Sequence, residues 1–400
     1  MSRILCVWEL GGYLGHLQRF LPLALKLQEQ GHEITFVVRD LSGTETVFGK
    51  HHFKTYQAPV WLLQAHGLPS PPENYAEILM QFGYLDKNGL LGVVKAWRNI
   101  FELIKPDLVL FDYAPTALIA ARDLTVPRAI IGSGFFTPPD ASPTPGLRPW
   151  AKVTDKRLRT SDQNVMNVIN EVLEALHLTP ITRLCEIFHV EENFITTFQE
   201  LDFYPNRQNT TYWGPIWGED SGIAPTWANH PGKKIFAYLK LEYDGVENII
   251  KAMQQMGGNS LIFVSNLPDS IIEKYQSPTL QFSRESYRMS NIIQECDAVL
   301  SHAGGGMLST ILLGGIPQLL FPMQIEQYTM ALNARELGTA LLCDLEPSVE
   351  DIAQKLTEIL ETPSYLKQAK QFADKYKHLL AQQPVDNIAR QCELLLAAEQ

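Results

Sequence analysis

The stretch SHAGGGMLST at residues 301–310 constrains the fold most, because it places a glycine-rich loop between two short apolar runs. Residues 298–300 form the first run, and residues 318–321 form the second, after a short apolar segment. This order predicts a strand, a glycine loop, a short helix and another strand. A glycine loop that opens a helix presents free backbone N–H groups and the positive end of the helix dipole, and both attract phosphate. We therefore expect an anion site here, with His302 at the end of the strand.

Strand-like and helix-like patterns alternate along the 400 residues. In the first half we expect strands at 3–9, 32–38, 108–111, 129–131 and 196–201. In the second half we expect strands at 235–239, 260–264, 298–300, 318–321 and 340–342. Such alternation predicts an α/β chain with parallel sheets.

The composition changes after residue 204, where 205–232 carries four prolines, four glycines and three tryptophans. We therefore expect two Rossmann-like domains in a chain of this length. The predicted ranges are an N-terminal domain at 1–210, a linker at 211–232, a C-terminal domain at 233–382 and a final amphipathic helix at 383–400.

Charge and cysteine usage argue against several classes of protein. The net charge of −11 argues against nucleic-acid binding, which normally needs a basic surface. The five cysteines stand singly, so we expect neither a disulfide framework nor a metal site, and we expect a reducing compartment. The N-terminus lacks a signal-peptide pattern, and no apolar stretch reaches the length of a membrane span. We expect a cytoplasmic protein; peripheral membrane contact stays open and the oligomeric state is undetermined.

His16 and Asp112 are a candidate catalytic pair. His16 follows the first expected strand, and Asp112 ends the third. Because ligands bind at the carboxyl ends of parallel strands, we expect both side chains at the same edge of the sheet. An imidazole that bonds a carboxylate through one nitrogen can take a proton on the other. Position alone leaves a second interpretation open, in which each residue only caps a helix.

Three glycines near the N-terminus form part of a dinucleotide-binding pattern. That pattern is G-x-G-x-x-G, with an acid near the end of the second strand. Gly12 and Gly15 match it, Leu10 takes the place of the first glycine, and Asp40 is the acid. Because the match is partial, a nicotinamide-dependent dehydrogenase is the weaker interpretation.

A polar pair follows the strand expected at 318–321. The run PMQIEQ at 322–327 places Glu326 and Gln327 at the start of a helix. There they can accept hydrogen bonds from sugar hydroxyls and donate to them. Alone, they equally fit an ordinary helix N-terminus, where the dipole favours an acid.

Together these motifs resemble the GT-B glycosyltransferases, most closely the macrolide and UDP-glucuronosyl types. The donor box of that family runs H-x-G-x-G-T, G-x-P and P-x-x-x-D-Q-x-x-N-A. Here the matching segments are HAGGG at 302–306, GIP at 315–317 and PMQIEQ at 322–327. The family's N-terminal G-H-x-x-P element resembles Gly15-His16, with Leu-Pro at 21–22. The segment before the family's linker resembles YWGP at 212–215.

The resemblance implies an inverting displacement at the anomeric carbon of a UDP- or dTDP-sugar, with no obligatory metal and no cofactor besides the sugar donor. It implies that His16 is the base, that Asp112 orients it, and that the helix at 383–400 crosses back to the N-terminal domain. It also implies a bacterial source. The implied donor-binding residues are His302, Gly304, Gly305, Gly306, Glu326 and Gln327.

The chain departs from the family's pattern at three positions. Met307 stands where a phosphate-binding Thr or Ser is usual, Thr310 where a Glu often binds the ribose, and Met330 where an Asn follows the acid-amide pair. These departures bear on the nucleotide and the sugar more than on the fold.

Three further residues are implied donor contacts. The family's base-stacking segment appears as SYRM at 286–289, so we expect Tyr287 to stack on the base and the backbone near Met289 to read it. Lys240 follows the first strand of the second domain, where its charge can meet a phosphate or simply be solvated.

The favoured hypothesis is a glycosyltransferase that acts on a hydroxyl of a small-molecule or lipid-like acceptor. The alternatives are a GT-B isomerase of the nucleotide-sugar 2-epimerase kind and a non-catalytic nucleotide-sugar-binding protein. We expect segments 55–95 and 135–150, rich in prolines and aromatics, to shape the acceptor pocket. Their aromatics favour an apolar acceptor or, equally, only pack the loops.

Overall fold

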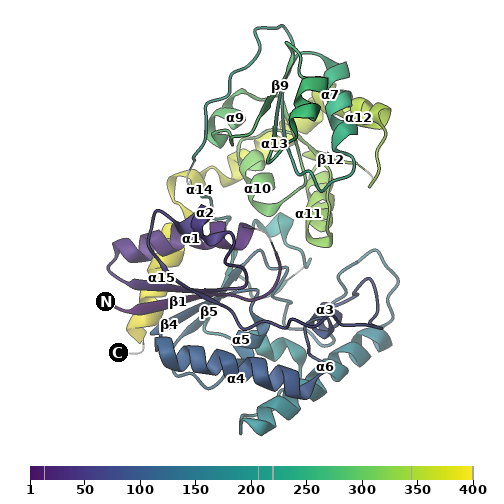
Figure 1. Cartoon of the computed structure of the whole chain (residues 1–400). Helices are drawn as coiled ribbons and strands as arrows, with labels where there is room; N and C mark the ends of the chain where they lie inside the picture. Colours follow the sequence, from purple (N-terminus) through teal and green to yellow (C-terminus); the bar gives the residue numbers. More distant parts are fainter. Residues whose placement is uncertain (13, 206, 219, 344, 399–400) are drawn as a thin grey trace. The chain divides into compact units, whose positions relative to one another are not determined.

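The chain forms two compact units in a computed structural model that describes residues 1–12, 14–205, 207–218, 220–343 and 345–398 (Figure 1). The first unit comprises Met1–Thr197, Tyr204–Ile216 and Pro384–Gln400. The second comprises Phe198–Phe203 and Trp217–Gln383. The last helix therefore belongs to the first unit; of its predicted range, residues 399–400 lie outside the described part. Among the described residues, no helix has both the length and the apolar character of a membrane span.

A six-stranded parallel sheet of order β3-β2-β1-β4-β5-β6 organises the first unit. Its strands are β1 (Arg3–Trp8), β2 (Glu33–Val38), β3 (Lys54–Gln57), β4 (Leu108–Asp112), β5 (Arg128–Gly132) and β6 (Glu192–Ile195). The central strands β1 and β4 are buried almost from end to end. Near-continuous apolar runs of this kind are typical of parallel strands covered by helices on both faces.

The helices of the first unit are α1 (Gly15–Glu29), α2 (Thr44–Phe48), α3 (Tyr75–Met80), α4 (Lys87–Ile104), α5 (Pro115–Ala120), α6 (Asp155–Ala175), η1 (Leu184–Phe188) and α15 (Pro384–Ala398). Helix α1 buries Leu17, Phe20 and Leu27 on one face, as the helical periodicity predicts. Helix α15 packs beside α1, where Lys26 Nζ lies 2.8 Å from Asp386 Oδ1.

The second unit repeats this plan with the parallel order β12-β11-β10-β7-β8-β9. Its strands are β7 (Lys234–Leu239), β8 (Asn259–Val264), β9 (Leu280–Ser283), β10 (Ala298–Ser301), β11 (Gln318–Leu320) and β12 (Ala340–Leu342). Its helices are η2 (Gln199–Leu201), α7 (Val246–Met256), α8 (Asp269–Tyr275), α9 (Met289–Glu295), α10 (Gly305–Leu313), α11 (Ile325–Glu336), α12 (Val349–Glu361), α13 (Pro363–Tyr376) and α14 (His378–Ala381).

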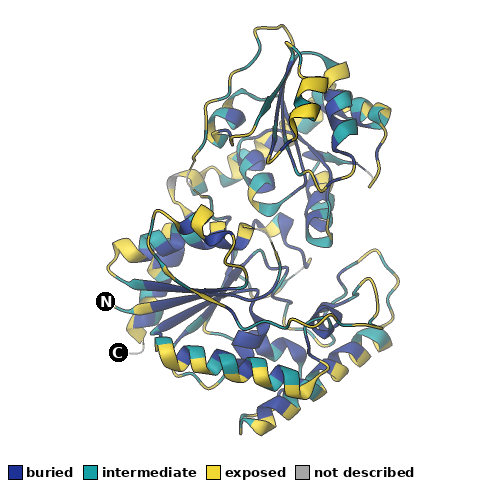
Figure 2. Cartoon of the chain, viewed as in Figure 1, coloured by how far each residue is buried: buried dark blue, intermediate teal, exposed yellow. Residues whose placement is uncertain are grey.

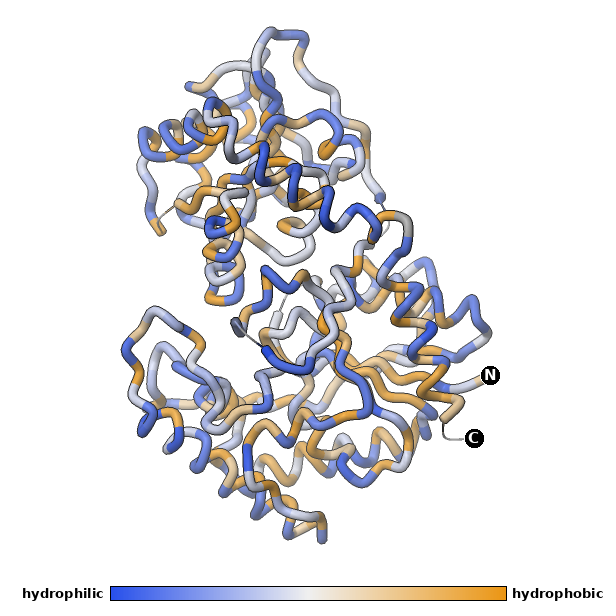
Figure 3. The backbone as a smooth tube through the Cα atoms, turned by 180° about the vertical axis from the view of Figure 1, so that it is seen from behind, coloured by the Kyte–Doolittle hydropathy of each residue, from blue (hydrophilic) through white to orange (hydrophobic). Residues whose placement is uncertain are grey.

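Both sheets have the same strand order when counted along the chain. In each, the first strand lies beside the fourth, so the order reverses between β1 and β4 and between β7 and β10. Ligands of doubly wound folds bind at this switch point, outside the carboxyl ends of the strands. Figure 2 shows the strands as buried and the outer helix faces as exposed. Figure 3 shows the strands of the first unit as apolar segments in its interior. The predicted α/β fold with two Rossmann-like domains is confirmed.

One strand lies elsewhere than predicted. The strand expected at 196–201 lies at β6, which ends at Ile195, and the 3-10 helix η2 follows it. Phe198 and Leu201 leave the sheet because they are buried in a hydrophobic cluster of the second unit. A run of β-branched and apolar residues could not reveal this change of partner.

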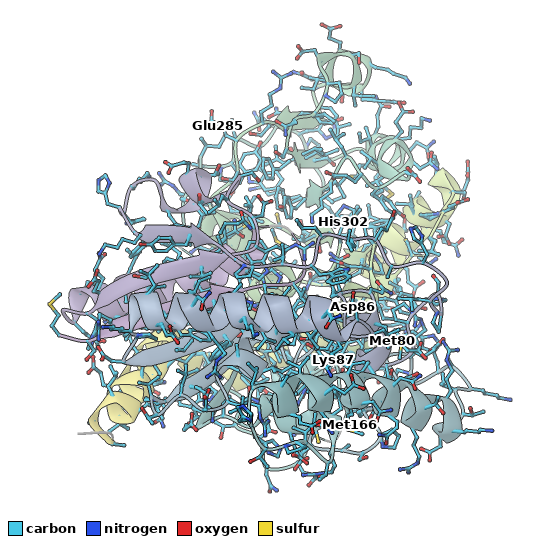
Figure 4. All side chains as sticks on the ribbon, turned by 60° about the horizontal axis from the view of Figure 1, so that its bottom comes forward. Met80, Asp86, Lys87, Met166, Glu285 and His302 are labelled. Carbon is cyan, nitrogen blue, oxygen red and sulfur yellow. The ribbon has the colours of Figure 1, made fainter. Side chains whose placement is uncertain are left out.

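Segment 55–95 is more regular than predicted. It contains α3 and the first turns of α4, which begins at Lys87 rather than near Trp97. Asp86 fixes this start, since its side chain accepts a hydrogen bond from the Gly89 N–H at 3.0 Å; Asp86 and Lys87 are labelled in Figure 4. Gly89 and Gly92 lie in the first turns of α4, and glycine is unfavourable inside helices, so the sequence pattern does not indicate a helix there.

Candidate active site

His16 and Asp112 meet at the switch point of the first sheet. Asp112 ends β4 in register with Trp8, the last residue of β1, and His16 lies in the first turn of α1. His16 Nδ1 is 2.9 Å from Asp112 Oδ2, and both side chains are buried. The two residues therefore lie as close together as the parallel-sheet argument predicts, while their roles stay predictions.

Arg19, which the sequence argument missed, completes this cluster. It lies one helical turn after His16, and its Nη1 donates to Asp112 Oδ2 at 2.7 Å. Burial raises the pKa of Asp112, but the Arg19 charge and the contact with His16 outweigh it and hold the pKa below its ordinary value. Asp112 is therefore a carboxylate at neutral pH. Its other oxygen, Oδ1, is buried without a hydrogen-bond partner among the described residues.

The carboxylate sets the tautomer of His16. A carboxylate can only accept, so His16 Nδ1–H donates to Asp112 and Nε2 keeps its lone pair. The Trp8 ring stacks on His16 with 4.9 Å between centroids and 19° between planes, which restrains the imidazole. Gly11 passes close to the second nitrogen, since a β-carbon there would lie 2.8 Å from Nε2, and its φ is +84°. This close approach explains a glycine at position 11 without a dinucleotide.

Two further aromatic rings lie near His16. Phe136 lies 5.7 Å from His16 between ring centroids, and Tyr113 stacks on Phe136 at 3.6 Å. Phe136 belongs to the proline-rich segment that was expected to shape a pocket. In segment 55–95, by contrast, Tyr75 and Tyr84 are fully buried and pack within the unit. Phe136 of the proline-rich segment therefore lies near His16, whereas Tyr75 and Tyr84 of segment 55–95 pack in the interior of the unit.

Glu9 is a second buried carboxyl group near this edge of the sheet. It follows β1, and its Oε2 accepts from the backbone N–H groups of Thr116 and Ala117 at 2.8 and 3.1 Å. Burial raises the pKa of Glu9 to about 7, although these hydrogen bonds act in the opposite direction.

This raised pKa predicts a pH-dependent stability. Between pH 4.5 and 7 the unfolded chain releases the Glu9 proton while the folded chain keeps it, so ionisation opposes folding as pH rises through this window. Glu9→Gln keeps a carbonyl acceptor and lacks the titration. Its free energy of unfolding, relative to the wild type, should rise by about 3 kcal/mol between pH 4.5 and pH 8. Urea unfolding at several pH values measures this, and a pH-independent difference would contradict it.

His302, which is labelled in Figure 4, directly follows β10, as predicted, and so lies at the switch point of the second sheet. Its Nδ1–H donates to the Phe321 carbonyl at 2.8 Å, and its Nε2 accepts from the Lys240 backbone N–H at 2.9 Å. Burial lowers the pKa of His302, so the ring is neutral. Both nitrogens are engaged, so a direct bond from His302 to a phosphate is not available in this arrangement. The ring instead connects the segments that directly follow three strands, because Lys240 follows β7, His302 follows β10 and Phe321 follows β11.

The glycine loop opens α10. Gly304 is the N-cap of this helix, with φ −62° and ψ 134°, and no side chain caps the helix. A β-carbon at Gly304 or Gly306 would have no heavy atom within 4 Å, so the approach to the helix N-terminus is open on these sides. Because the first N–H groups of a helix have no intrahelical partner, α10 offers several donors and the positive end of its dipole.

The residues that depart from the family pattern make apolar or local contacts. Met330 is buried beneath the loop, since a β-carbon at Gly305 would lie 3.4 Å from its Cε. Met307 packs against a hydrophobic cluster that also contains Tyr287. Thr310 Oγ1 donates to the Gly306 carbonyl at 2.9 Å within α10. These side chains shape the loop from within the unit.

Glu326 and Gln327, the polar pair at the start of α11, differ in burial and in hydrogen bonding. Gln327 is buried, and its Oε1 accepts from the Met323 N–H at 2.8 Å, so this oxygen fixes the turn into the helix. Glu326 lies in the first turn of α11 and is partly exposed. Of the two, Glu326 is the side chain more accessible to a ligand.

The other predicted donor contacts lie in different environments. Tyr287 is buried with its ring edge-on to Phe236 at 5.8 Å, so its ring already packs in the core. Met289 begins α9 and is half-buried. The Lys240 side chain is half-buried, and burial lowers its pKa. The structure thus brings Lys240 to His302 at the switch point.

Three kinds of known protein resemble this chain. Residues 283–395 match the family model described as "Erythromycin biosynthesis protein CIII-like, C-terminal domain". UDP-glycosyltransferase 79B2 of Arabidopsis thaliana is 24% identical over 389 residues, which cover 84% of this chain and 82% of that protein. Elloramycin glycosyltransferase ElmGT of Streptomyces olivaceus is 32% identical over 102 residues, which cover 26% of this chain and 25% of that protein.

Solved structures share the fold over the whole chain. The glycotransferase of kitacinnamycin superimposes with a TM-score of 0.70 at 15% identity and covers 98% of this chain and 99% of its own. SsfS6 of Streptomyces sp. SF2575, complexed with thymidine diphosphate, has a TM-score of 0.62 at 18% identity and covers 98% and 100%. The chain has the GT-B fold, and these relatives support glycosyltransferase activity for it. The resemblance to the macrolide-type transferases is thereby confirmed, and these relatives do not favour an isomerase or a non-catalytic binding protein for this glycosyltransferase.

Proposed function

We propose that this glycosyltransferase moves a sugar from a nucleoside diphosphate to a hydroxyl group of a small-molecule acceptor by a single inverting displacement. The observation that carries the mechanism is the buried contact of 2.9 Å between His16 Nδ1 and Asp112 Oδ2. It leaves His16 Nε2 able to accept a proton, which a general base requires.

In the proposed reaction, His16 Nε2 takes the proton of the acceptor hydroxyl. The acceptor oxygen forms a bond to the anomeric carbon while the bond from that carbon to the diphosphate oxygen breaks. The imidazolium formed on His16 is stabilised by the Asp112 carboxylate. The nucleoside diphosphate leaves with the electron pair of the broken bond, and the anomeric configuration is inverted.

We propose that backbone groups meet the charge of the leaving diphosphate. Gly304, Gly305 and Gly306 open α10, whose N-terminal N–H groups and dipole suit an anion. His302 supports this loop by holding strand ends rather than by bonding the phosphate. This arrangement requires no metal ion, and the nucleotide sugar is the substrate rather than a cofactor.

Thymidine or uridine diphosphate sugars are the proposed donors. The structural relatives VinC and SsfS6 carry thymidine diphosphate in their complexes, and the plant relative is described as a UDP-glycosyltransferase. In this chain, the partly exposed Glu326 in the first turn of α11 is the proposed contact to the donor sugar. The roles of Tyr287 and Met289 at the base stay predictions.

An apolar or aromatic acceptor suits the surroundings of His16. Phe136 and Tyr113 lie near the imidazole, and Tyr113 stacks on one face of Phe136. The partly exposed Phe136 ring is therefore the proposed surface on which an apolar ring system can pack. The function is tested by incubating the protein with a panel of UDP- and dTDP-sugars and aromatic or macrocyclic alcohols. Nucleotide release coupled to a glycosylated product of the expected mass is the predicted result. Release without product on every acceptor would contradict transfer.

Arg19 gives a prediction for the pH dependence of transfer. Its charge helps to hold the pKa of Asp112 below its ordinary value, and activity needs the carboxylate, so Arg19→Met should move the acid limb of the pH–rate profile upward. Arg19→Lys keeps a positive charge and should keep most of the original profile. The measurement is kcat/KM against pH for the three proteins; an unmoved acid limb in Arg19→Met would contradict the proposed coupling.

A further inference from the structure

The segment after β5 and the helix η1 bring three different metal-ligand side chains together in the first unit. Asp140, Cys185 and His189 each offer one ligand atom, and these atoms lie within 4.8 Å of one another. Cys185 Sγ is 3.0 Å from Asp140 Oδ1, and His189 Nε2 is 3.8 Å from the same oxygen. Neighbouring ligands of a tetrahedral zinc ion are separated by about 3.3–3.8 Å, given bonds of about 2.0–2.3 Å, so little movement is required.

Two of these ligands come from η1 and from the extended residue that ends it. Cys185 and His189 are four residues apart, with Cys185 inside η1 and His189 at its C-cap. The cysteine is buried, whereas Asp140 and His189 are more than half exposed, at 58% and 53%. An ion could therefore reach the site from solvent and bind a sulfur at its inner end.

We propose that Asp140, Cys185 and His189 form a binding site for a zinc-like divalent ion, with a fourth position open to water. Thiolate, imidazole and carboxylate together form a donor set of borderline softness, which favours zinc over magnesium or calcium. On binding, the Cys185 thiol loses its proton to solvent and the thiolate sulfur bonds the metal. The ion would clamp Asp140, on the segment that also carries Phe136, to η1.

Arg183 is the competitor of the metal at this site. Its Nη1 lies 2.6 Å from Asp140 Oδ1 and thus occupies the carboxylate in the absence of an ion. Glu186 Oε1 lies 3.9 Å from Arg183 Nε and offers the guanidinium a second partner. The geometry thus allows Arg183 to move to Glu186 when a metal takes Asp140. Removing Arg183 should therefore strengthen metal binding, which is the opposite of its effect on an ordinary surface salt bridge.

The test adds Co²⁺, and then Zn²⁺ in competition, to the chelator-treated full chain. We expect Co²⁺ to give a near-ultraviolet thiolate-to-cobalt charge-transfer band, and Zn²⁺ to remove this band by displacing the cobalt. The band should be absent in Cys185→Ser and present in the control variant Cys296→Ser. His189→Gln, a change at an exposed residue that the fold tolerates, should weaken binding more than about tenfold. Arg183→Gln should strengthen it.

Two results would overturn the proposed site. The first is the absence of a thiolate band in the wild-type chain or its persistence in Cys185→Ser. The second is equal metal affinity in the wild type, His189→Gln and Arg183→Gln. Because the readout is metal binding alone, neither result depends on sugar transfer or on the role of His16.

Discussion

Replacing His16 with alanine should lower the rate of sugar transfer about a thousandfold, within the range that general base catalysis supplies. Of His16 and Arg19, the described side chains that bond Asp112, only the His16 imidazole has a second nitrogen with a lone pair. The proposed donor loop lies in the other compact unit, so His16→Ala should leave the dissociation constant of the donor unchanged. Steady-state rates and calorimetry with the donor alone measure the two quantities.

The first unit contains a matched control for this variant. The side chain of His32 is also largely covered, at 7% exposed, and it also pairs with an acid, since its Nε2 lies 2.5 Å from Glu393 Oε1. It precedes β2, at the opposite end of the strands from His16. His32→Ala should therefore affect the melting temperature but keep the rate of transfer. Equal loss of transfer in both variants would indicate a general effect on folding.

Gly304→Asp should weaken donor binding about a hundredfold without destabilising the fold. Gly304 is an N-cap with extended backbone and open space around its β-position, and aspartate is a favourable N-cap residue. The melting temperature should therefore stay equal or rise. The new carboxylate would stand where the diphosphate is proposed to bind, and like charges a few ångströms apart repel by several kcal/mol at a partly buried site.

The variant Gly304→Asn is the control that distinguishes the effect of the aspartate charge from the effect of its size. Asparagine has nearly the same volume and the same capping ability as aspartate. In both variants the new side chain therefore accepts a hydrogen bond from one backbone N–H group at the start of α10. We expect the asparagine variant to weaken donor binding at least tenfold less than the aspartate variant. Equal donor affinity in Gly304→Asp and the wild type would place the diphosphate elsewhere than at α10.

Most strands of the two sheets could be predicted from the sequence because they are short, nearly continuous apolar runs. The strands β3 (KTYQ) and β9 (LQFS) at the sheet edges carry polar residues and are less buried, so the apolar pattern did not indicate them. The glycine loop at 301–310 marks the turn from β10 into α10, and it lies where predicted. Because strand order fixes which carboxyl ends are neighbours, the meeting of His16 with Asp112 follows from the same argument.

Other features depend on partners that a sequence pattern does not contain. His302 binds the Phe321 carbonyl and the Lys240 N–H, and backbone partners leave no residue signature. The contact of Tyr287 with a base stays a prediction; its ring also packs edge-on to Phe236, and an aromatic residue suits either environment. Arg19 carried a weak signal, since a residue three positions after His16 on a helix lies on the same face.

The metal-ligand cluster was missed for a different reason. Closely spaced cysteines are the usual sequence signal of a metal site, whereas Asp140 lies 45 residues before Cys185 and only the fold brings them together. The four-residue spacing of Cys185 and His189 was visible, but it gains meaning only once η1 places both side chains beside Asp140.

The anomeric configuration of the product tests the central claim most directly. A single displacement assisted by His16 as base must invert the configuration of the transferred sugar. Proton NMR of the isolated product, compared with that of the donor, reports this configuration through the coupling at the anomeric proton. We predict the opposite configuration in product and donor. A product with retained configuration would contradict the assignment of His16 and Asp112 as the base and its partner in a direct displacement.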